Sequence, residues 1–344
     1  MKQEKRILLL TPSFMNIYKD VMSCLEEKGW IVSWVKDNQI PKNPYIRDTH
    51  IWNRKPKRLY NNEVESLWKK ILSEPQYSFT YDAFLAIDGL MAHPYLFETL
   101  RKRNPNVKLV LFLYDRIDGH FQTNSFFSYY DKLFSFDLRD CQKYKLNFLP
   151  IYWCPSINTL ENKYDIFGLA SLRYESQDRL VVFEKVKKIA QDNNIPEYIK
   201  LLYPTNINKY IYALKCLAMR MMGRRCFSIE ELKNNALFTN TSITPEQFRV
   251  LIQQSKTILD TQNPYQDGLT ARFMWALGLE KKIITTNESA MLYDFYDEKQ
   301  VFILKDNYNE LLDFIQSSFE MSDTKREIIA NYRIDNWIET LLRG

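Results

Sequence analysis

Residues 260–287 read DTQNPYQDGLTARFMWALGLEKKIITTN, and this segment says more about the fold than any other. It predicts a buried strand that ends in Asp260, a polar loop with one glycine, a helix from about Leu269, and a short strand from Lys282 to Thr285. Such a unit directs the N–H groups of a helix N-terminus at the carboxyl edge of a parallel sheet, where α/β proteins bind phosphorylated ligands. Because the chain contains only 8 glycines, Gly268 at the start of this helix is informative.

Length and composition indicate a globular protein with two domains. The chain has 344 residues, of which 45% are hydrophobic and 26% charged, and this is enough for two hydrophobic cores. The chain contains no run of 18 apolar residues, so we expect no transmembrane helix. The N-terminal run Ile7–Leu10 follows basic residues but is cut short by Thr11 and Pro12, so we expect a first strand rather than a signal peptide.

Charge, cysteines and histidines argue against several kinds of site. A net charge of +5 is mildly basic, and without an RNP or zinc-finger pattern we expect no nucleic-acid partner. Sugar-nucleotide phosphates and an anionic membrane surface explain the charge equally well. The odd number of cysteines and the lack of a C-x-x-C pair favour reduced thiols in a cytoplasm; they are Cys24, Cys141, Cys154, Cys216 and Cys226. The three histidines are scattered, so no metal site is expected.

The first half of the chain alternates apolar runs with helical patterns, which predicts a doubly wound parallel α/β sheet. The expected strands are Arg6–Leu10, Trp30–Val35, Asp82–Ile87, Val107–Tyr114, Lys132–Phe136 and Phe148–Trp153. The expected helices are Tyr18–Lys28, Glu63–Leu72 and Pro94–Arg103, and Lys36–Tyr60 is expected to be a long basic loop. Three of the strands end at an acid, namely Asp88, Asp115 or Asp137, and polar residues at such strand ends line the ligand crevice of this architecture.

The second half repeats the pattern after an interdomain linker at Cys154–Lys163. The expected strands are Tyr164–Gly168, Tyr198–Tyr203, Thr257–Asp260, Lys282–Thr285 and Val301–Leu304. Helices are expected over Arg179–Asn193 and Asn208–Gly223, after the capping box that begins at Thr244, and from about Tyr308 to the end. We therefore expect an N-terminal domain over residues 1–155, a C-terminal domain over 164–320 and a helical tail over 321–344.

These residues resemble bacterial GT-B glycosyltransferases of capsular, exopolysaccharide and lipopolysaccharide assembly. The resemblance is carried by Gln266–Arg272, Ala276–Gly278 and Lys281–Asn287 in the second half, and by Tyr81–Gly89, Leu113–Asp115 and Leu133–Asp137 with Asp140 in the first. It implies two Rossmann-like domains that face a cleft, with the acceptor on the N-terminal domain and the nucleotide sugar on the C-terminal one. It also implies a last helix that crosses back, and a reaction without a metal, because helix dipoles and basic side chains carry the diphosphate charge.

The resemblance assigns site residues to both domains. The donor would be bound by Arg173, Arg179, Gln266, Asp267, Gly268, Leu269, Thr270, Arg272 and Asn287. The acceptor side would consist of Asp88, Gly89, Arg116 and His120, with Asp115 and Asp137 as the catalytic acids. Asp115 would be the general base of an inverting enzyme, and would only orient the acceptor in a retaining one.

Ordinary structural roles compete with several of these assignments. Gly268 can simply precede a capped helix, and Arg173 and Arg179 can be solvated loop residues. His120 can be a plain loop histidine, and Asp137 or Asp140 can cap a helix.

One position departs from the family pattern. Related retaining enzymes carry two glutamates eight positions apart, which here correspond to Asp267 and Trp275. The second glutamate commonly holds the donor ribose, and a tryptophan cannot do so.

Two functions from different classes remain open. The first is a metal-independent, retaining glycosyltransferase that moves a sugar from a nucleotide sugar to a lipid-linked saccharide, in the cytoplasm at the inner face of the membrane. The second is a non-catalytic GT-B protein that binds or scaffolds an active transferase, and a sugar-nucleotide epimerase is a weaker third. The helix Asn208–Gly223 or the basic loop Lys36–Arg58 could contact the membrane, although such a helix more often packs on its sheet.

Overall fold

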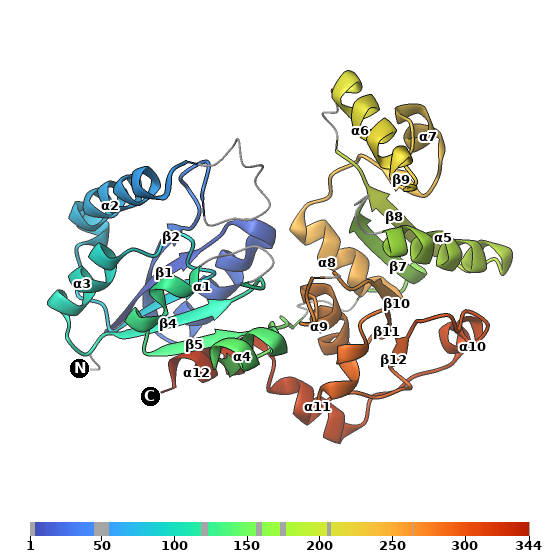
Figure 1. Ribbon diagram of the computed structural model, residues 1–344. Helices are drawn as coiled ribbons and strands as arrows, with labels where there is room; N and C mark the ends of the chain where they lie inside the picture. The colour runs from blue at the N-terminus through green and yellow to red at the C-terminus, as the bar shows by residue number, and fades with distance from the viewer. Residues whose placement is uncertain are drawn as a thin grey trace. The chain divides into compact units, whose positions relative to one another are not determined.

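The chain folds into two compact units (Figure 1). The structure is a computed structural model that describes residues 4–44, 55–117, 123–155, 160–172, 177–204, 208–263 and 265–343. The first unit comprises Met1–Cys154, Tyr265–Gly268 and Ala330–Gly344, and the second comprises Pro155–Pro264 and Leu269–Ile329. The C-terminal segment therefore returns to the first unit, as the resemblance implied.

The first unit is built on a six-stranded parallel sheet with the strand order β2-β1-β3-β4-β5-β6. Its strands are β1 (Lys5–Thr11), β2 (Trp30–Lys36), β3 (Ala83–Ile87), β4 (Lys108–Leu113), β5 (Lys132–Ser135) and β6 (Asn147–Phe148). Its helices are α1 (Ile17–Glu27), α2 (Lys57–Ser73), α3 (Pro94–Arg103), α4 (Leu138–Tyr144) and α12 (Ile334–Leu342), with 3₁₀ turns η1 (Phe14–Asn16), η3 (Pro75–Tyr77) and η4 (Thr123–Tyr129).

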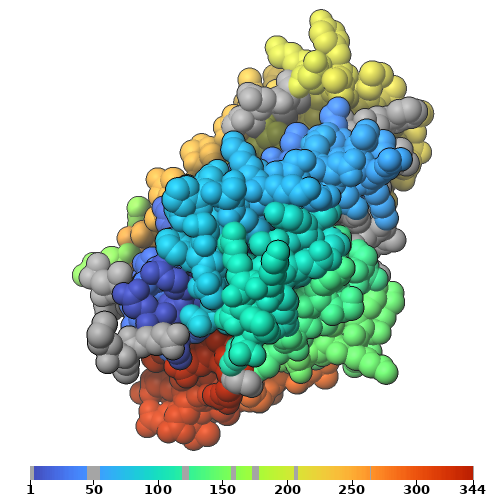
Figure 2. All heavy atoms as spheres, turned by 90° about the vertical axis from the view of Figure 1, so that its left-hand side faces the viewer, coloured from blue at the N-terminus to red at the C-terminus, as the bar shows by residue number. Residues whose placement is uncertain are grey.

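Both faces of this sheet are covered, because successive side chains of a strand point to opposite faces. On one face, Leu109 and Leu111 of β4 join a core with α2 and α3, and Figure 2 shows these two helices in blue and teal on the surface of the unit. On the other face, Phe112 packs edge-on against Trp337 of α12, with ring centroids 4.7 Å apart. The last helix is thus part of the core of the first unit.

The second unit contains a six-stranded parallel sheet with the order β12-β11-β10-β7-β8-β9. Its strands are β7 (Tyr164–Ser171), β8 (Glu197–Leu202), β9 (Phe238–Thr239), β10 (Ser255–Asp260), β11 (Lys282–Thr285) and β12 (Val301–Ile303). Its helices are α5 (Gln177–Asp192), α6 (Lys209–Met221), α7 (Ile229–Asn234), α8 (Pro245–Gln253), α9 (Ala271–Gly278), α10 (Leu311–Gln316) and α11 (Asp323–Ala330), with the 3₁₀ turn η5 (Glu288–Leu292). Counted along the chain, this is the 3-2-1-4-5-6 order of dinucleotide-binding sheets.

Local signals set most helix boundaries. Thr244 forms the capping box of α8, with Pro245 as its first residue. Gly29 follows α1 with φ +82°, the left-handed conformation that glycine adopts beyond a helix end. His93 caps α3 by accepting a hydrogen bond from the Tyr95 amide. The alternating α/β architecture predicted from the sequence is confirmed.

Several expectations were wrong in detail. The strand expected at Phe148–Trp153 is reduced to the two residues of β6, and α2 begins at Lys57, inside the stretch that was expected to be a loop. Helix α9 begins at Ala271 rather than Leu269, because Thr270 is its N-cap. The C-terminal region consists of three helices, α10 to α12, and neither α7 nor β9 was foreseen. These differences lie where turns and tertiary contacts outweigh local pattern.

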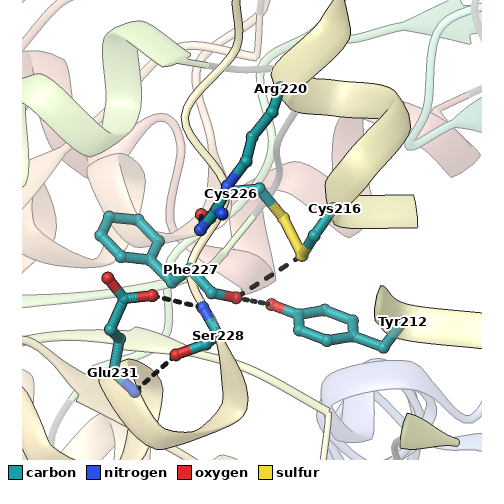
Figure 3. Close-up of a disulfide and its surroundings, with 7 residues drawn as sticks. All are labelled: Tyr212, Cys216, Arg220, Cys226, Phe227, Ser228 and Glu231. Carbon is teal, nitrogen blue, oxygen red and sulfur yellow. Dashed lines mark hydrogen bonds between the residues drawn. A yellow bond between two sulfur atoms is a disulfide. The ribbon is translucent and has the colours of Figure 1, made fainter. Parts of the chain in front are cut away.

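The expectation that all five cysteines are reduced is also wrong, since Cys216 and Cys226 form a disulfide (Figure 3). Gly223 adopts φ +71° at the end of α6 and turns the chain back on the helix. The Cα atoms of the two cysteines then lie 5.3 Å apart, within the range that a disulfide can bridge. Cys24, Cys141 and Cys154 are not part of a disulfide.

Candidate functional site

The second unit has a topological switch point between β7 and β10. The chain proceeds from β7 toward β8 on one side and from β10 toward β11 on the other. Connections that leave in opposite directions open a crevice beyond the carboxyl ends of the two strands, where sheets of this kind bind ligands. These ends are Ser171 and Asp260.

Arg179 of α5 bridges this switch point. Its Nε donates to Thr261 Oγ1 at 2.9 Å, just after β10, and its Nη1 donates to the Ser171 carbonyl at 3.3 Å, at the end of β7. The guanidinium therefore lies between the two strand ends. A planar guanidinium with several donors suits the oxygens of a diphosphate.

Asp260, Thr270 and Arg272 form a buried network beside the switch point. Thr270 caps α9 by accepting from the Phe273 amide, and its hydroxyl donates to Asp260 Oδ1 at 2.9 Å. Arg272 Nη1 lies 3.4 Å from Asp260 Oδ1 and donates to the Leu259 carbonyl at 3.2 Å. The predicted donor residues Thr270 and Arg272 are thus held by the end of β10.

Burial controls the ionisation of this network. Desolvation raises the pKa of Asp260, although the nearby Arg272 charge and the Thr270 hydroxyl act in the opposite direction. Desolvation likewise lowers the pKa of Arg272, against the effect of Asp260. Each charge is costly to bury and depends on the other, so Arg272 has a structural role besides the donor contact predicted for it.

Trp275, at the position of the family's second glutamate, is a core residue of α9. Its side chain is buried and packs edge-on against Phe248 of α8, with ring centroids 6.2 Å apart. The Arg249 guanidinium carbon lies 4.6 Å from the Trp275 ring centroid, within cation–π distance. The tryptophan fills space that a glutamate side chain would leave empty.

The segment Tyr265–Gly268 belongs to the first unit and is anchored at the ends of β4 and β5. Gln266 Nε2 donates to Asp115 Oδ1 at 2.7 Å, and Arg116 Nη1 donates to the Tyr265 carbonyl at 2.9 Å. Asp267 forms an ion pair with Arg139 of α4. Residues predicted as donor ligands are therefore in contact with residues predicted for the acceptor side.

Asp137 is the centre of this anchor. One carboxylate oxygen caps α4 by accepting from the amides of Arg139 and Asp140. The other oxygen accepts from the amides of Asp267 at 2.8 Å and Gly268 at 3.1 Å. The capping role considered for Asp137 is confirmed, and the Gly268 amide predicted to face a phosphate donates to this carboxylate instead.

Gly268 is required by a close approach. A Cβ added to it would lie 2.4 Å from the Phe136 ring and 2.8 Å from the Phe136 carbonyl oxygen. No side chain fits at that distance. The following residue, Leu269, is buried and belongs to the second unit.

Two further strand-end acids are buried in the first unit. Asp88, which has φ +66° and precedes Gly89, accepts from the Tyr114 amide at 2.8 Å and the Asp115 amide at 3.3 Å. Asp37, just after β2, accepts from the amides of Leu90 at 2.7 Å and Met91 at 2.8 Å. Asp37 falls in the stretch that was expected to be a loop, although it follows its strand just as the other acids follow theirs.

Burial shifts the ionisation of both acids. Desolvation raises the pKa of Asp37 to about 6, although the amides of Leu90, Asn38 and Met91 act against it. Desolvation, and then the charge of Asp115, raise the pKa of Asp88 well above its usual range. Burial therefore favours the protonated form of both acids at this edge of the sheet.

The remaining predicted residues add little to the description of the site. Asn287 is buried after β11 and caps η5 by accepting from the Ser289 amide. Arg173 and His120 lie outside the described residues. Within the described ranges no cluster of three or more His, Cys, Asp or Glu residues could hold a metal ion. In that same part of the chain, every helix is too short or too polar to span a bilayer.

A polar cavity of about 680 Å³ lies at the opposite, amino edge of the second sheet. Its lysines are occupied: Lys256 pairs with Asp165, and Lys282 Nζ donates to the carbonyls of Ile315 and Ser317 at the end of α10. Burial lowers the pKa of Lys282 to about 8. Nothing in this cavity points to a ligand.

Comparison with known proteins identifies the fold but no family. No protein-family model matches the chain, and no curated protein matches it in sequence. A structure of α,α-trehalose 6-phosphate synthase from Burkholderia multivorans is similar over 98% of this chain and 97% of that one, with a TM-score of 0.56 and 11% identity. An α-glucosyltransferase in complex with UDP and a 13-mer DNA with a central A:G mismatch is similar over 95% and 94%, with a TM-score of 0.52 and 11% identity. The chain therefore has the GT-B fold of two Rossmann-like domains.

Proposed function

We propose that the protein is a glycosyltransferase that moves a sugar from a nucleotide sugar to a saccharide acceptor. The observation that supports this most directly is Arg179, whose guanidinium bridges Thr261 and Ser171 at the switch point of the second unit. The leaving group of the reaction is a nucleoside diphosphate, and its departure needs fixed positive charge close to the bridging oxygen. The two fold neighbours are named as a sugar-phosphate synthase and a glucosyltransferase with UDP, which makes UDP the first nucleotide to test.

The acids of the first unit fit the acceptor side of this reaction. An inverting enzyme needs a base for the acceptor hydroxyl, and Asp115, at the end of β4, is the candidate. In the retaining reaction that we favour, Asp115 orients the acceptor and no metal is needed. By its resemblance, the chain acts on a lipid-linked saccharide in bacterial surface polysaccharide assembly, at the cytoplasmic side of the membrane.

The test is donor binding and turnover by the full chain. UDP-, GDP-, CDP- and dTDP-sugars are screened for a rise in melting temperature and for release of nucleoside diphosphate, with and without saccharide acceptors. Arg179→Ala should weaken binding of the preferred nucleotide by about tenfold or more, which corresponds to one lost charge-assisted contact. The matched control is Arg225→Ala, because Arg225 of the same unit is exposed and pairs with Glu184, away from the switch point. If no nucleotide sugar binds, or if both variants bind like the wild type, the proposal fails.

A second candidate function is a non-catalytic GT-B protein that binds or scaffolds an active transferase. The buried Trp275 favours it, because this residue occupies the position at which the resembled enzymes hold the donor ribose. Nucleotide binding without turnover over a broad panel of acceptors would support this candidate. Turnover by the purified chain would exclude it.

A further inference from the structure

Helix α6 presents an apolar stripe to solvent. Tyr210, Leu214, Leu217 and Met221 lie at positions i, i+4, i+7 and i+11, on one face of the helix. Their exposed fractions are 84%, 68%, 57% and 77%. Only Cys216 of this helix is buried, and α6 reaches the core of the second unit through the partly buried Tyr212. Contiguous exposed apolar surface of this kind marks an interaction site.

The opposite face of α6 is anchored to the segment before α7 (Figure 3). Tyr212 Oη donates to the Phe227 carbonyl at 2.9 Å, and Arg220 Nη2 donates to the Cys226 carbonyl at 3.1 Å. Between them, Cys216 forms the disulfide to Cys226. These anchors lie at positions i, i+4 and i+8, so they fix the rotation of the helix and keep the stripe outward.

Helix α6 and the turn that follows it are rich in basic residues. From Asn208 to Phe227 the chain contains no acid and five basic residues, namely Lys209, Lys215, Arg220, Arg224 and Arg225. At about 100° per residue, Lys215 lies at the border of the exposed apolar surface, next to Ile211, whereas Lys209 lies at the angle of Cys216 and Arg220, on the anchored side. A long basic side chain at the border can lay its stem on an apolar surface while its charged end reaches anionic groups.

This combination of charge and apolar surface selects the partner. A second copy docked through the same stripe would bring the two basic clusters together, and like charges repel. An anionic bilayer offers both a hydrocarbon boundary for the stripe and phosphate groups for the lysines. We propose that α6 docks the protein onto an anionic membrane surface, with Tyr210, Leu214, Leu217 and Met221 inserted at the headgroup boundary.

The docking surface is separate from the donor site, so its test needs no nucleotide sugar. The full chain is sedimented with vesicles of phosphatidylcholine and phosphatidylglycerol, and with vesicles of phosphatidylcholine alone. We expect at least about tenfold tighter binding to the anionic vesicles, weakened by salt. Failure of this test leaves the proposed transferase reaction intact, and failure to find a donor leaves the docking surface intact.

Paired variants separate the two contributions. Leu214→Ser with Met221→Ser should reduce binding to anionic vesicles by about tenfold or more, because both side chains lose their apolar contact. Lys215→Gln with Arg224→Gln should reduce binding to the anionic vesicles and weaken its dependence on salt. The matched control is Leu59→Ser with Leu292→Ser, because these leucines are also exposed but lie on other elements.

Three outcomes would overturn the proposal. The first is equal binding to both kinds of vesicle or to neither. The second is equal loss of binding in the α6 variant and in the leucine control. The third is a dimer in sedimentation velocity that Leu214→Ser with Met221→Ser dissociates, which would assign the stripe to a second copy of the chain.

Discussion

Arg272 Nη1 lies 3.4 Å from Asp260 Oδ1, and this pair joins the start of α9 to the end of β10. Both side chains are largely buried, with exposed fractions of 16% and 1%. The sequence alone indicated that Arg272 contacts the donor. Because the two charges are buried together, loss of Arg272 should also destabilise the fold, and the first prediction tests this.

Arg272→Met should lower the free energy of unfolding by about 3 kcal/mol, because it removes the main counter-charge of the buried Asp260. The double variant Arg272→Met with Asp260→Asn should lose less, since no charge is then left unpaired. Urea denaturation of the two single variants and the double variant measures the difference. Additive losses would mean that the two residues act independently.

Gly268→Ala should destabilise the first unit by about 1–3 kcal/mol, the usual cost of overpacking. The new Cβ would lie 2.4 Å from the Phe136 ring, so the ring must move. Adding Phe136→Leu should recover part of the loss, but not all of it, because the Phe136 carbonyl oxygen is also only 2.8 Å away. A melting temperature unchanged in Gly268→Ala would show that the segment does not approach Phe136 in solution.

Asp137→Ala should cost about 3 kcal/mol or more, since it removes a helix cap and two further acceptor contacts. Asp137→Asn serves as the comparison, because its remaining oxygen can cap α4 but cannot also accept from Asp267 and Gly268. We therefore expect Asn to fall between Ala and the wild type in chemical denaturation. Equal stability of all three proteins would contradict the anchoring role.

Trp275→Glu should destabilise the second unit by about 3–5 kcal/mol, because a charged and smaller side chain replaces a buried ring. Trp275→Phe should destabilise the unit less than Trp275→Glu. The indole Nε1 has no hydrogen-bond partner among the described residues, so its removal leaves no acceptor without a donor. Thermal unfolding and UDP binding are measured on the same samples. If Trp275→Glu kept its stability and bound UDP more tightly, this would support ribose binding at this position.

Asp37 should make the wild type lose stability as the pH rises from about 4 to about 6. Its pKa is raised from 3.8 to about 6 in the folded protein, so the folded state holds the proton over this window while the unfolded state releases it. The difference of about 2 pKa units corresponds to roughly 3 kcal/mol. Asp37→Asn, which cannot ionise, should show a flatter profile over that window.

The pH prediction is checked by urea denaturation of both proteins across that range. The measured quantity is the difference between them, because Asp88 and other acids also titrate. Parallel profiles for the wild type and Asp37→Asn would contradict the prediction.

Much of the fold and part of the site followed from the sequence. Apolar runs and helical periodicity located the parallel strands, because strand and helix patterns repeat within a few residues. The capping box at Thr244, the proline at the start of α3 and Gly29 fixed helix ends for the same local reason. Asp88, Asp115 and Asp137 were expected at one edge of one sheet because each follows a parallel strand, and they lie there.

Tertiary structure alone decided the roles of several individual residues. Asp137 and Gly268 are 131 positions apart, and no local pattern indicates that the carboxylate of one accepts from the amide of the other. The same holds for the burial of Trp275 against Phe248 and for the return of α12 to the first core. The sequence shows that α6 is amphipathic, but only its anchoring through Cys216 shows which face is left for a partner. Hydrogen bonds within an element depend on neighbouring residues, whereas burial and partners depend on where distant segments meet.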